Sequence, residues 1–203
     1  MRKLNILTFI TLDGVMQAPG GPEEDATGGF KYGGWSFPFF DDFLEKVMDG
    51  QMNHDFDLLL GRKTYEIFAS YWPFADTEKD PGATALNKAR KYVVSGSMKN
   101  AEWKNSVIIK SNVPEEIRKL KEMNGPEIQV HGSGNLIQTL LKNDLADELW
   151  LKIFPVTLGS GKKLFEEGKF AGRYMLTECK SSPAGVIIAN YKRSGEIKTG
   201  SFV

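Results

Sequence analysis

The apolar residues of the chain fall into short runs typical of buried strands, separated by segments in which they recur at helical spacing. The short runs predict strands at residues 3–11, 56–60, 91–95, 107–110, 128–131 and 148–154. The intervening segments predict helices at 39–52, 61–71, 85–89, 114–123 and 135–141. Two further strands, 173–180 and 185–191, predict a β-hairpin near the C-terminus. Strands alternating with helices and ending in a hairpin predict an α/β fold, with a mostly parallel sheet and an antiparallel edge.

The stretch between residues 17 and 38 fits neither pattern. Six glycines and three prolines there exclude a regular element, yet Phe30, Tyr32 and Trp35 make the segment unusually aromatic for a linker. A segment of this length without regular structure inside a compact domain is either functional or disordered.

Charge and composition exclude several classes of function. The chain has 203 residues with 26 basic and 26 acidic side chains, so no net charge steers it toward nucleic acid or a membrane surface. No apolar run approaches the length of a membrane-spanning helix, and the N-terminal residues lack the features of a signal peptide. We therefore expect a single domain over residues 1–203, with neither a nucleic-acid nor a membrane partner.

Cysteine and histidine are scarce. Cys179 is the only cysteine, which excludes an internal disulfide and fits a cytoplasmic location. His54 and His131 are the only histidines, so the side chains that bind zinc are too few and no metal site is predicted.

The segment IQVHGSGNLIQTLL, residues 128–141, predicts a strand that turns directly into a helix. Its turn contains Gly132, Ser133, Gly134 and Asn135, and Leu136 begins the apolar face of the helix. Glycine allows close approach of a ligand, and a helix N-terminus offers free N–H groups to a phosphate. The spacing does not match the three-glycine dinucleotide fingerprint, because the third glycine is replaced by Ile137. The later loop at 156–163 does not match the phosphate-binding loop that ends in Gly-Lys-Ser/Thr, because it has Val156 and Lys163 at the required positions. A tight connection without a ligand is the alternative.

A second strand-to-helix turn has the same character. Gly61 follows an apolar strand, and Arg62, Lys63 and Thr64 open the next helix. Two cations in a first turn are unfavourable to the helix dipole unless an anion lies nearby, although two solvated basic residues are the alternative. Ser95 ends a third strand with a hydroxyl that suits a ribose phosphate or a simple turn. Ligands of open parallel sheets bind beyond the carboxyl ends of the strands, where these three turns lie.

Three acidic residues are candidates for proton transfer. Asp13 follows the first strand, and Asp41 and Asp42 lie at the start of the first helix. A buried carboxyl can protonate a substrate nitrogen or anchor the edge of an amidine-like ring. The alternatives are a turn residue at Asp13 and helix capping at Asp41 and Asp42.

Four segments carry these residues in one order: TLDGV at 11–15, LLGRKTYE at 59–66, VHGSGNL at 130–136 and FPVTLGSGKKLF at 154–165. Together they resemble the dihydrofolate reductase superfamily, and more closely its riboflavin-biosynthesis reductase branch. The resemblance covers nearly the whole chain and implies a three-layer α/β/α dihydrofolate reductase-like fold.

The resemblance also implies NADPH as cofactor. Gly132 to Leu136 would hold its pyrophosphate, the segment Gly61 to Thr64 its phosphates, and Ser95 its adenosine end. The 17–38 loop would cover the nicotinamide, with Trp35 and Asp41 beside the substrate. Asp13 and Asp42 would be the candidate catalytic acids.

The function implied is hydride transfer from NADPH to a C=N or C=O group of a pterin- or aminopyrimidine-like substrate. This is similar to 5-amino-6-(5-phosphoribosylamino)uracil reductase of riboflavin biosynthesis, and relatives of this kind are commonly homodimers. The alternative is a dimeric dinucleotide-binding protein without catalytic turnover, which would keep the phosphate turns and lose the substrate side.

Overall fold

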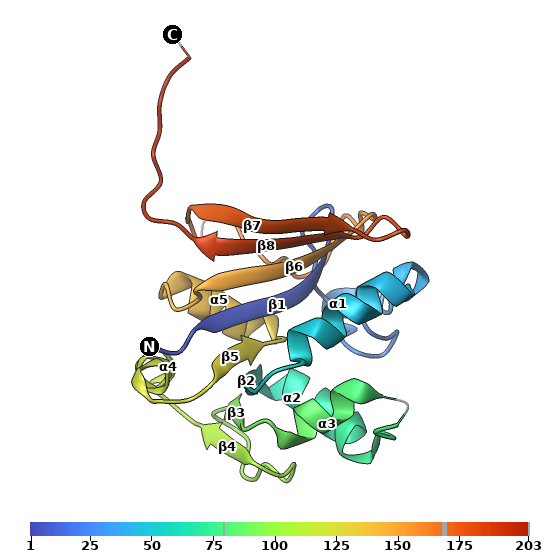
Figure 1. The fold of residues 1–203 in the computed structure, drawn as a ribbon, viewed down its shortest axis with the longest axis vertical. Coiled ribbons are helices and arrows are strands. Elements are labelled where there is room, and N and C mark those ends of the chain that lie inside the picture. Colours follow the sequence, from blue (N-terminus) through green and yellow to red (C-terminus); the bar gives the residue numbers. More distant parts are fainter. Residues whose placement is uncertain (79, 168–169, 203) are drawn as a thin grey trace.

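The computed structural model describes residues 1–78, 80–167 and 170–202. In this part of the chain eight strands form one sheet, in the order β4-β3-β2-β5-β1-β6-β8-β7 (Figure 1). Every pairing from β4 to β6 is parallel, whereas β8 pairs antiparallel with both β6 and β7. The strands are β1 Leu4–Thr11, β2 Phe56–Gly61, β3 Lys91–Val94, β4 Ser106–Ile109, β5 Glu127–Val130, β6 Glu148–Phe154, β7 Tyr174–Ser181 and β8 Ile187–Arg193.

Helices cover both faces of the sheet, as Figure 1 shows. They are α1 Asp42–Met52, α2 Arg62–Tyr71, α3 Pro81–Lys88, α4 Val113–Glu122 and α5 Gly134–Lys142. The apolar sides of α4 and α5 pack on one face, and those of α1, α2 and α3 pack on the other. The predicted α/β architecture with a mostly parallel sheet and an antiparallel C-terminal hairpin is confirmed.

The central strands are apolar because both of their faces are covered. In β1, Leu4 and Ile6 contact the α4 and α5 layer, while Phe9 faces the layer that contains α1. Two predicted helix starts are wrong by a few residues. The first helix begins at Asp42 rather than at residue 39, because Pro38 lies in a short 3-10 turn, Phe37–Phe39. The third begins at Pro81 instead of residue 85, since proline is favoured in a first helical turn.

The glycine-rich stretch between residues 17 and 38 is irregular, as predicted, but it is anchored to the core. The indole of Trp35 packs edge-on against Phe154 and donates to the carbonyl oxygen of Gln17 at 2.8 Å. Gln17 also links the stretch to the loop after β6, because its Oε1 accepts from the backbone N–H of Lys162 at 3.0 Å. The stretch therefore forms one wall of the molecule at the carboxyl end of the sheet.

Beyond β8 the chain runs away from the sheet as an extended C-terminal segment (Figure 1). No helix in the described residues has the length and apolar character needed to cross a bilayer.

Candidate functional site

A cleft of about 1300 Å³ lies at the carboxyl ends of the parallel strands. Its walls come from the irregular segment 16–25, the end of α1, the start of α2 and the turn that joins β5 to α5. All ten residues predicted to bind the cofactor line it: Gly61, Arg62, Lys63, Thr64, Ser95, Gly132, Ser133, Gly134, Asn135 and Leu136. The fold thus gathers three separate segments of the sequence around one space.

The glycines at the two strand-to-helix turns are required by close packing. The N–H of Gly61 donates to the carbonyl oxygen of Gly132 at 3.2 Å, so the turns touch through their backbones. A Cβ on Gly61 would lie 2.1 Å from Oγ of Ser133, and a Cβ on Gly132 would lie 2.7 Å from Oγ1 of Thr64. Any side chain at either position would force the turns apart.

Both helices that follow these turns begin without a side-chain cap. Gly61 precedes α2 and Ser133 precedes α5, and neither provides a side-chain hydrogen bond to the first turn of its helix. The N–H groups of a first helical turn have no acceptor within the helix. Two helix N-termini with free donors and positive dipole ends therefore meet at one cleft, which is a suitable site for a phosphate or pyrophosphate.

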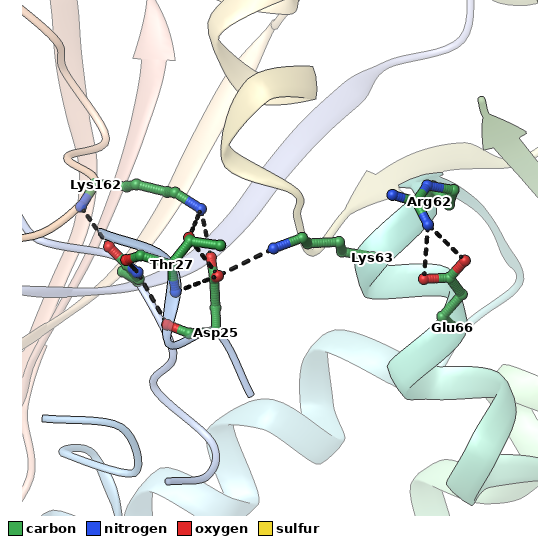
Figure 2. Close-up of polar contacts among 7 residues, drawn as sticks. Asp25, Thr27, Arg62, Lys63, Glu66 and Lys162 are labelled. Carbon is green, nitrogen blue, oxygen red and sulfur yellow. Dashed lines mark hydrogen bonds and ion pairs between the residues drawn. The ribbon is translucent and has the colours of Figure 1, made fainter. Parts of the chain in front are cut away.

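A charged cluster spans the mouth of the cleft (Figure 2). Asp25 accepts from Nζ of Lys63 at 3.0 Å and from Nζ of Lys162 at 2.5 Å, and Lys162 also donates to Oγ1 of Thr27. Burial alone would raise the pKa of Asp25, but the hydrogen bonds from Lys162, Thr27 and Lys63 outweigh it and hold that pKa well below its usual value. The carboxylate therefore ties the irregular segment to the start of α2.

Arg62, which comes immediately before Lys63, behaves differently. Its guanidinium pairs with Glu66 one helical turn away at 3.0 Å and is half exposed. Figure 2 shows it turned away from the Asp25 cluster. An exposed pair of this kind contributes little to stability, so Arg62 is free to exchange Glu66 for another anion.

The floor of the cleft carries a polar group that the sequence analysis missed. Lys152 projects from the middle of β6 and donates a hydrogen bond to Oε1 of Gln51, near the end of α1. Gln129 on β5 donates to the carbonyl oxygen of Gln51 and to Glu127, and its own Oε1 lies 3.2 Å from Nε2 of His131. A lysine among the apolar residues that follow Glu148 in this strand is the signal in the sequence that could have revealed this floor.

Burial shifts the ionisation of two groups on this floor. Burial lowers the pKa of Lys152 to about 7. Burial, helped by the charge of Lys152, lowers the pKa of His131 to about 3, so the imidazole is neutral at physiological pH. The cleft thus combines a wall suited to phosphate with a floor that has ionisable side chains.

The acidic residues predicted from the sequence do not line the cleft. Asp13 accepts from the backbone N–H groups of Leu158 and Gly159 and from the hydroxyl of Thr11, so it supports a turn. Asp41 caps α1 by accepting from the N–H of Leu44 at 2.8 Å, and it also accepts from Ala184 at 3.0 Å. Both carboxylates are thus already engaged in holding loops and a helix start.

The two other predicted roles on the substrate side also lack support in the geometry. Asp42 is the first residue of α1 and lies outside the cleft. Trp35, predicted to lie beside the substrate, is 7% exposed and its ring packs in the core, so it presents little surface to the cleft. Among the described residues no cluster of three or more His, Cys, Asp or Glu could hold a metal ion.

The family model of the RibD C-terminal domain matches residues 2–188. The chain belongs to the RibD C-terminal domain family. Within known sequences, the uncharacterized protein YyaP of Bacillus subtilis is 31% identical over 159 residues, which cover 77% of this chain and 79% of YyaP. The uncharacterized protein YwjB of the same organism is 28% identical over 113 residues, covering 54% of this chain and 58% of YwjB.

Solved structures share the fold of this RibD C-terminal domain. A putative riboflavin biosynthesis protein from Shewanella sp. PV-4 has a TM-score of 0.67 at 19% identity, covering 95% of this chain and 99% of that one. A pyrimidine reductase-like protein from Corynebacterium diphtheriae has a TM-score of 0.62 at 13% identity, covering 96% and 93%. Dihydrofolate reductase from Enterococcus faecalis, in complex with NADP(H), has a TM-score of 0.62 at 16% identity, covering 95% and 97%. The predicted dihydrofolate reductase-like fold is confirmed.

Proposed function

We propose that this protein is an NADPH-dependent reductase that transfers a hydride to a C=N or C=O group of a small pterin- or aminopyrimidine-like substrate. The observation that carries the proposal is the meeting of two uncapped helix N-termini, through Gly61 and Gly132, at a single cleft. Free N–H donors at two helix starts suit two linked phosphates better than one isolated anion.

The residues present fit a dinucleotide. A Cβ on Gly61 or Gly132 would fill the space between the two turns. Because glycine has no Cβ, the backbone from Gly132 to Leu136 stays open to a pyrophosphate. Lys63 and Arg62 supply cations from the start of α2, and Thr64 and Ser95 supply hydroxyls on the same cleft. When bound there, the reduced nicotinamide would supply the hydride, while the chain positions both reactants and excludes water.

The cleft also has room for a second small molecule. Its volume of about 1300 Å³ exceeds the range of about 300–1000 Å³ typical of a site for one drug-sized ligand. Beside the polar floor it is lined by Phe9, Met48 and Met52, which favour a flat, partly apolar ring. Membership of the RibD C-terminal domain family supports a heterocyclic substrate of this kind, as does the fold shared with a putative riboflavin biosynthesis protein and a pyrimidine reductase-like protein. The homodimer and the cytoplasmic location stay predictions from the sequence.

Fluorescence titration of the purified protein with NADPH and with NADH tests the cofactor. We expect micromolar binding of NADPH and much weaker binding of NADH. Replacing both Arg62 and Lys63 by alanine should weaken NADPH binding by at least about tenfold, which corresponds to about 1.4 kcal/mol. Lys88→Ala is the matched control, because Lys88 is also an ion-paired lysine but lies outside the cleft. If neither nucleotide binds, the phosphate interpretation of both turns is wrong, whereas the family assignment stands.

A further inference from the structure

Within the part of the chain that the structure describes, Lys152 is a buried cation without a counter-charge. The residue is 3% exposed, and its only hydrogen bond within the described residues goes to Gln51. No carboxylate of the described chain lies within ion-pair distance of its Nζ atom. An ammonium group has three donors, so two of them have no protein acceptor and lie at the cleft that Lys152 lines. Leaving a buried charge unsatisfied is costly, and a ligand that offers an oxygen or nitrogen acceptor removes that cost.

The elements packed around Lys152 offer no compensating charge. Phe9 on β1 and Ile188 on β8 are its register neighbours on the same face of the sheet. Gln51 faces it from α1, and His131, immediately after β5, is the titratable group whose pKa Lys152 affects. The carboxylate in this hydrogen-bond network is Glu127, which bonds Gln129, Asn5 and His54 rather than the lysine.

Hydrogen bonds in the floor also define the state of His131. Both partners of Nε2 of Gln129 are acceptors, a carbonyl oxygen and a carboxylate, so the orientation of this amide is determined. Its Oε1 atom must then accept from Nε2 of His131. In the neutral ring this leaves Nδ1 without a proton, so His131 can only accept there. Lys152 is therefore the proton donor of the cleft floor.

A second buried lysine shows what a purely structural role requires. Lys91 is fully buried, but its Nζ donates to the carbonyl oxygens of Asn87 and Lys104 and lies 4.1 Å from the centre of the Trp103 ring. Lys91 does not line the cleft. The protein thus satisfies a buried ammonium where it serves packing alone, and it does not do so at Lys152.

We propose that Lys152 is the catalytic acid of the reduction, with Nζ bonded to the oxygen or nitrogen of the substrate's C=O or C=N group. This inference rests on the proposed reductase function and adds to it the requirement that the substrate place this heteroatom at the cleft floor. Gln51 would act as a positioning residue that aims the ammonium through its remaining hydrogen bond.

The step balances as a two-electron reduction. With the cofactor bound, the carbon of the double bond would receive a hydride, that is, two electrons and one hydrogen. The π pair of that bond moves to the heteroatom, which takes a proton from Nζ of Lys152. The products are the alcohol or amine, the oxidised nicotinamide and a neutral Lys152, which regains its proton from water. A pKa near the working pH suits this exchange, because the group is protonated when needed and readily gives up the proton.

Trace acetylation with acetic anhydride, read lysine by lysine with mass spectrometry across a range of pH, tests the donor without any substrate. Only the neutral amine reacts, so Lys152 should acetylate at least about 50-fold faster than the exposed Lys88 near pH 7.5, with a midpoint near pH 7. Lys91 is the control: burial lowers its pKa as well, to about 8, but it is fully buried outside the cleft, where the reagent has no access, so it should react slowly. A Lys152 that labels no faster than Lys88 overturns the proposal.

The second measurement separates this inference from the proposed function. We expect Lys152→Met to bind NADPH within about twofold of the original protein, and to lose at least about a hundredfold in kcat on pterin and aminopyrimidine carbonyl compounds, the usual contribution of a general acid. In the original protein kcat should decline above about pH 7, because Lys152 loses its proton there. In Lys152→Arg this decline should be absent, because arginine stays protonated. Turnover that survives in Lys152→Met contradicts the inference alone, whereas absence of NADPH binding contradicts the proposed function and the acid role with it.

Discussion

Replacing Lys152 by methionine should make the protein more stable, and the gain should depend on pH. Methionine has nearly the same length and no charge, so it fills the same space beside Phe9 and Ile188. The lysine has its pKa lowered from 10.5 to about 7 by burial alone. Its charged form is therefore less favourable in the folded protein than in the unfolded chain.

The magnitude follows from the two pKa values. Each tenfold difference in proton affinity corresponds to about 1.4 kcal/mol, so the charged lysine destabilises the fold by about 5 kcal/mol near pH 6, where both states are protonated. Between about pH 7 and 10.5 the unfolded chain binds a proton that the folded protein does not, so stability rises with pH. Near pH 9 the penalty is about 2 kcal/mol. Methionine removes it at every pH.

Urea unfolding near pH 6 and near pH 9 measures the effect. The free energy of unfolding of Lys152→Met, relative to the original protein, should be greater at the lower pH by about 3 kcal/mol. Loss of the hydrogen bond to Gln51 costs about 1–3 kcal/mol, but equally at both pH values, so the difference isolates the charge. The exposed Lys88→Met is the control and should show no such difference. An equal effect of Lys152→Met at both pH values would refute the argument that the charge is buried.

Three further changes test the walls of the cleft. Gly61→Ala should destabilise the protein by about 1–3 kcal/mol and weaken NADPH binding, because its Cβ would lie 2.1 Å from Ser133; unchanged thermal unfolding would contradict this packing. Asp25→Asn should speed hydrogen exchange in residues 16–27, because it releases Lys63; unaltered exchange would mean that the bridge does not hold the loop. Because the folded protein lowers the pKa of Asp25, the original protein loses stability as pH falls below about 4, and Asp25→Asn should abolish that part of the loss. Asp41→Ala should lower the urea midpoint through loss of a helix cap and leave the NADPH dissociation constant unchanged, whereas a weaker cofactor affinity would return this residue to the site.

Much of the wall to which we assign the cofactor could be predicted from the sequence, because its signals are local. A strand followed by glycine and a helix start is visible within ten residues, as in the segment 128–137. Parallel strands place all such turns at one edge of the sheet, so local patterns that repeat along the chain converge in space. This is why Gly61 to Thr64, Ser95 and Gly132 to Leu136 were predicted together and line one cleft.

The substrate side could not be predicted in the same way, because it depends on contacts between distant segments. Whether an acidic side chain faces a ligand depends on which N–H groups lie near it in space. Asp13 is bonded by Leu158 and Gly159, which are more than a hundred residues away in the sequence. Asp41 is bonded by Ala184, which is equally distant in the sequence. Trp35 is aromatic in any conformation, but only the packing against Phe154 determines that its ring is in the core.

The sequence by itself determined the order of strands and helices, the parallel sheet and the turns that suit phosphates, since hydrophobic period and glycine spacing act within a few residues. Only the tertiary structure decided which charges are buried and paired. Lys152 and Gln51 are separated by 101 residues and meet at the cleft floor, and Asp25 joins Lys63 to Lys162 across its mouth. The energy of a charge depends on the solvent and the partners around it, and these exist only once the sheet and its loops have come together.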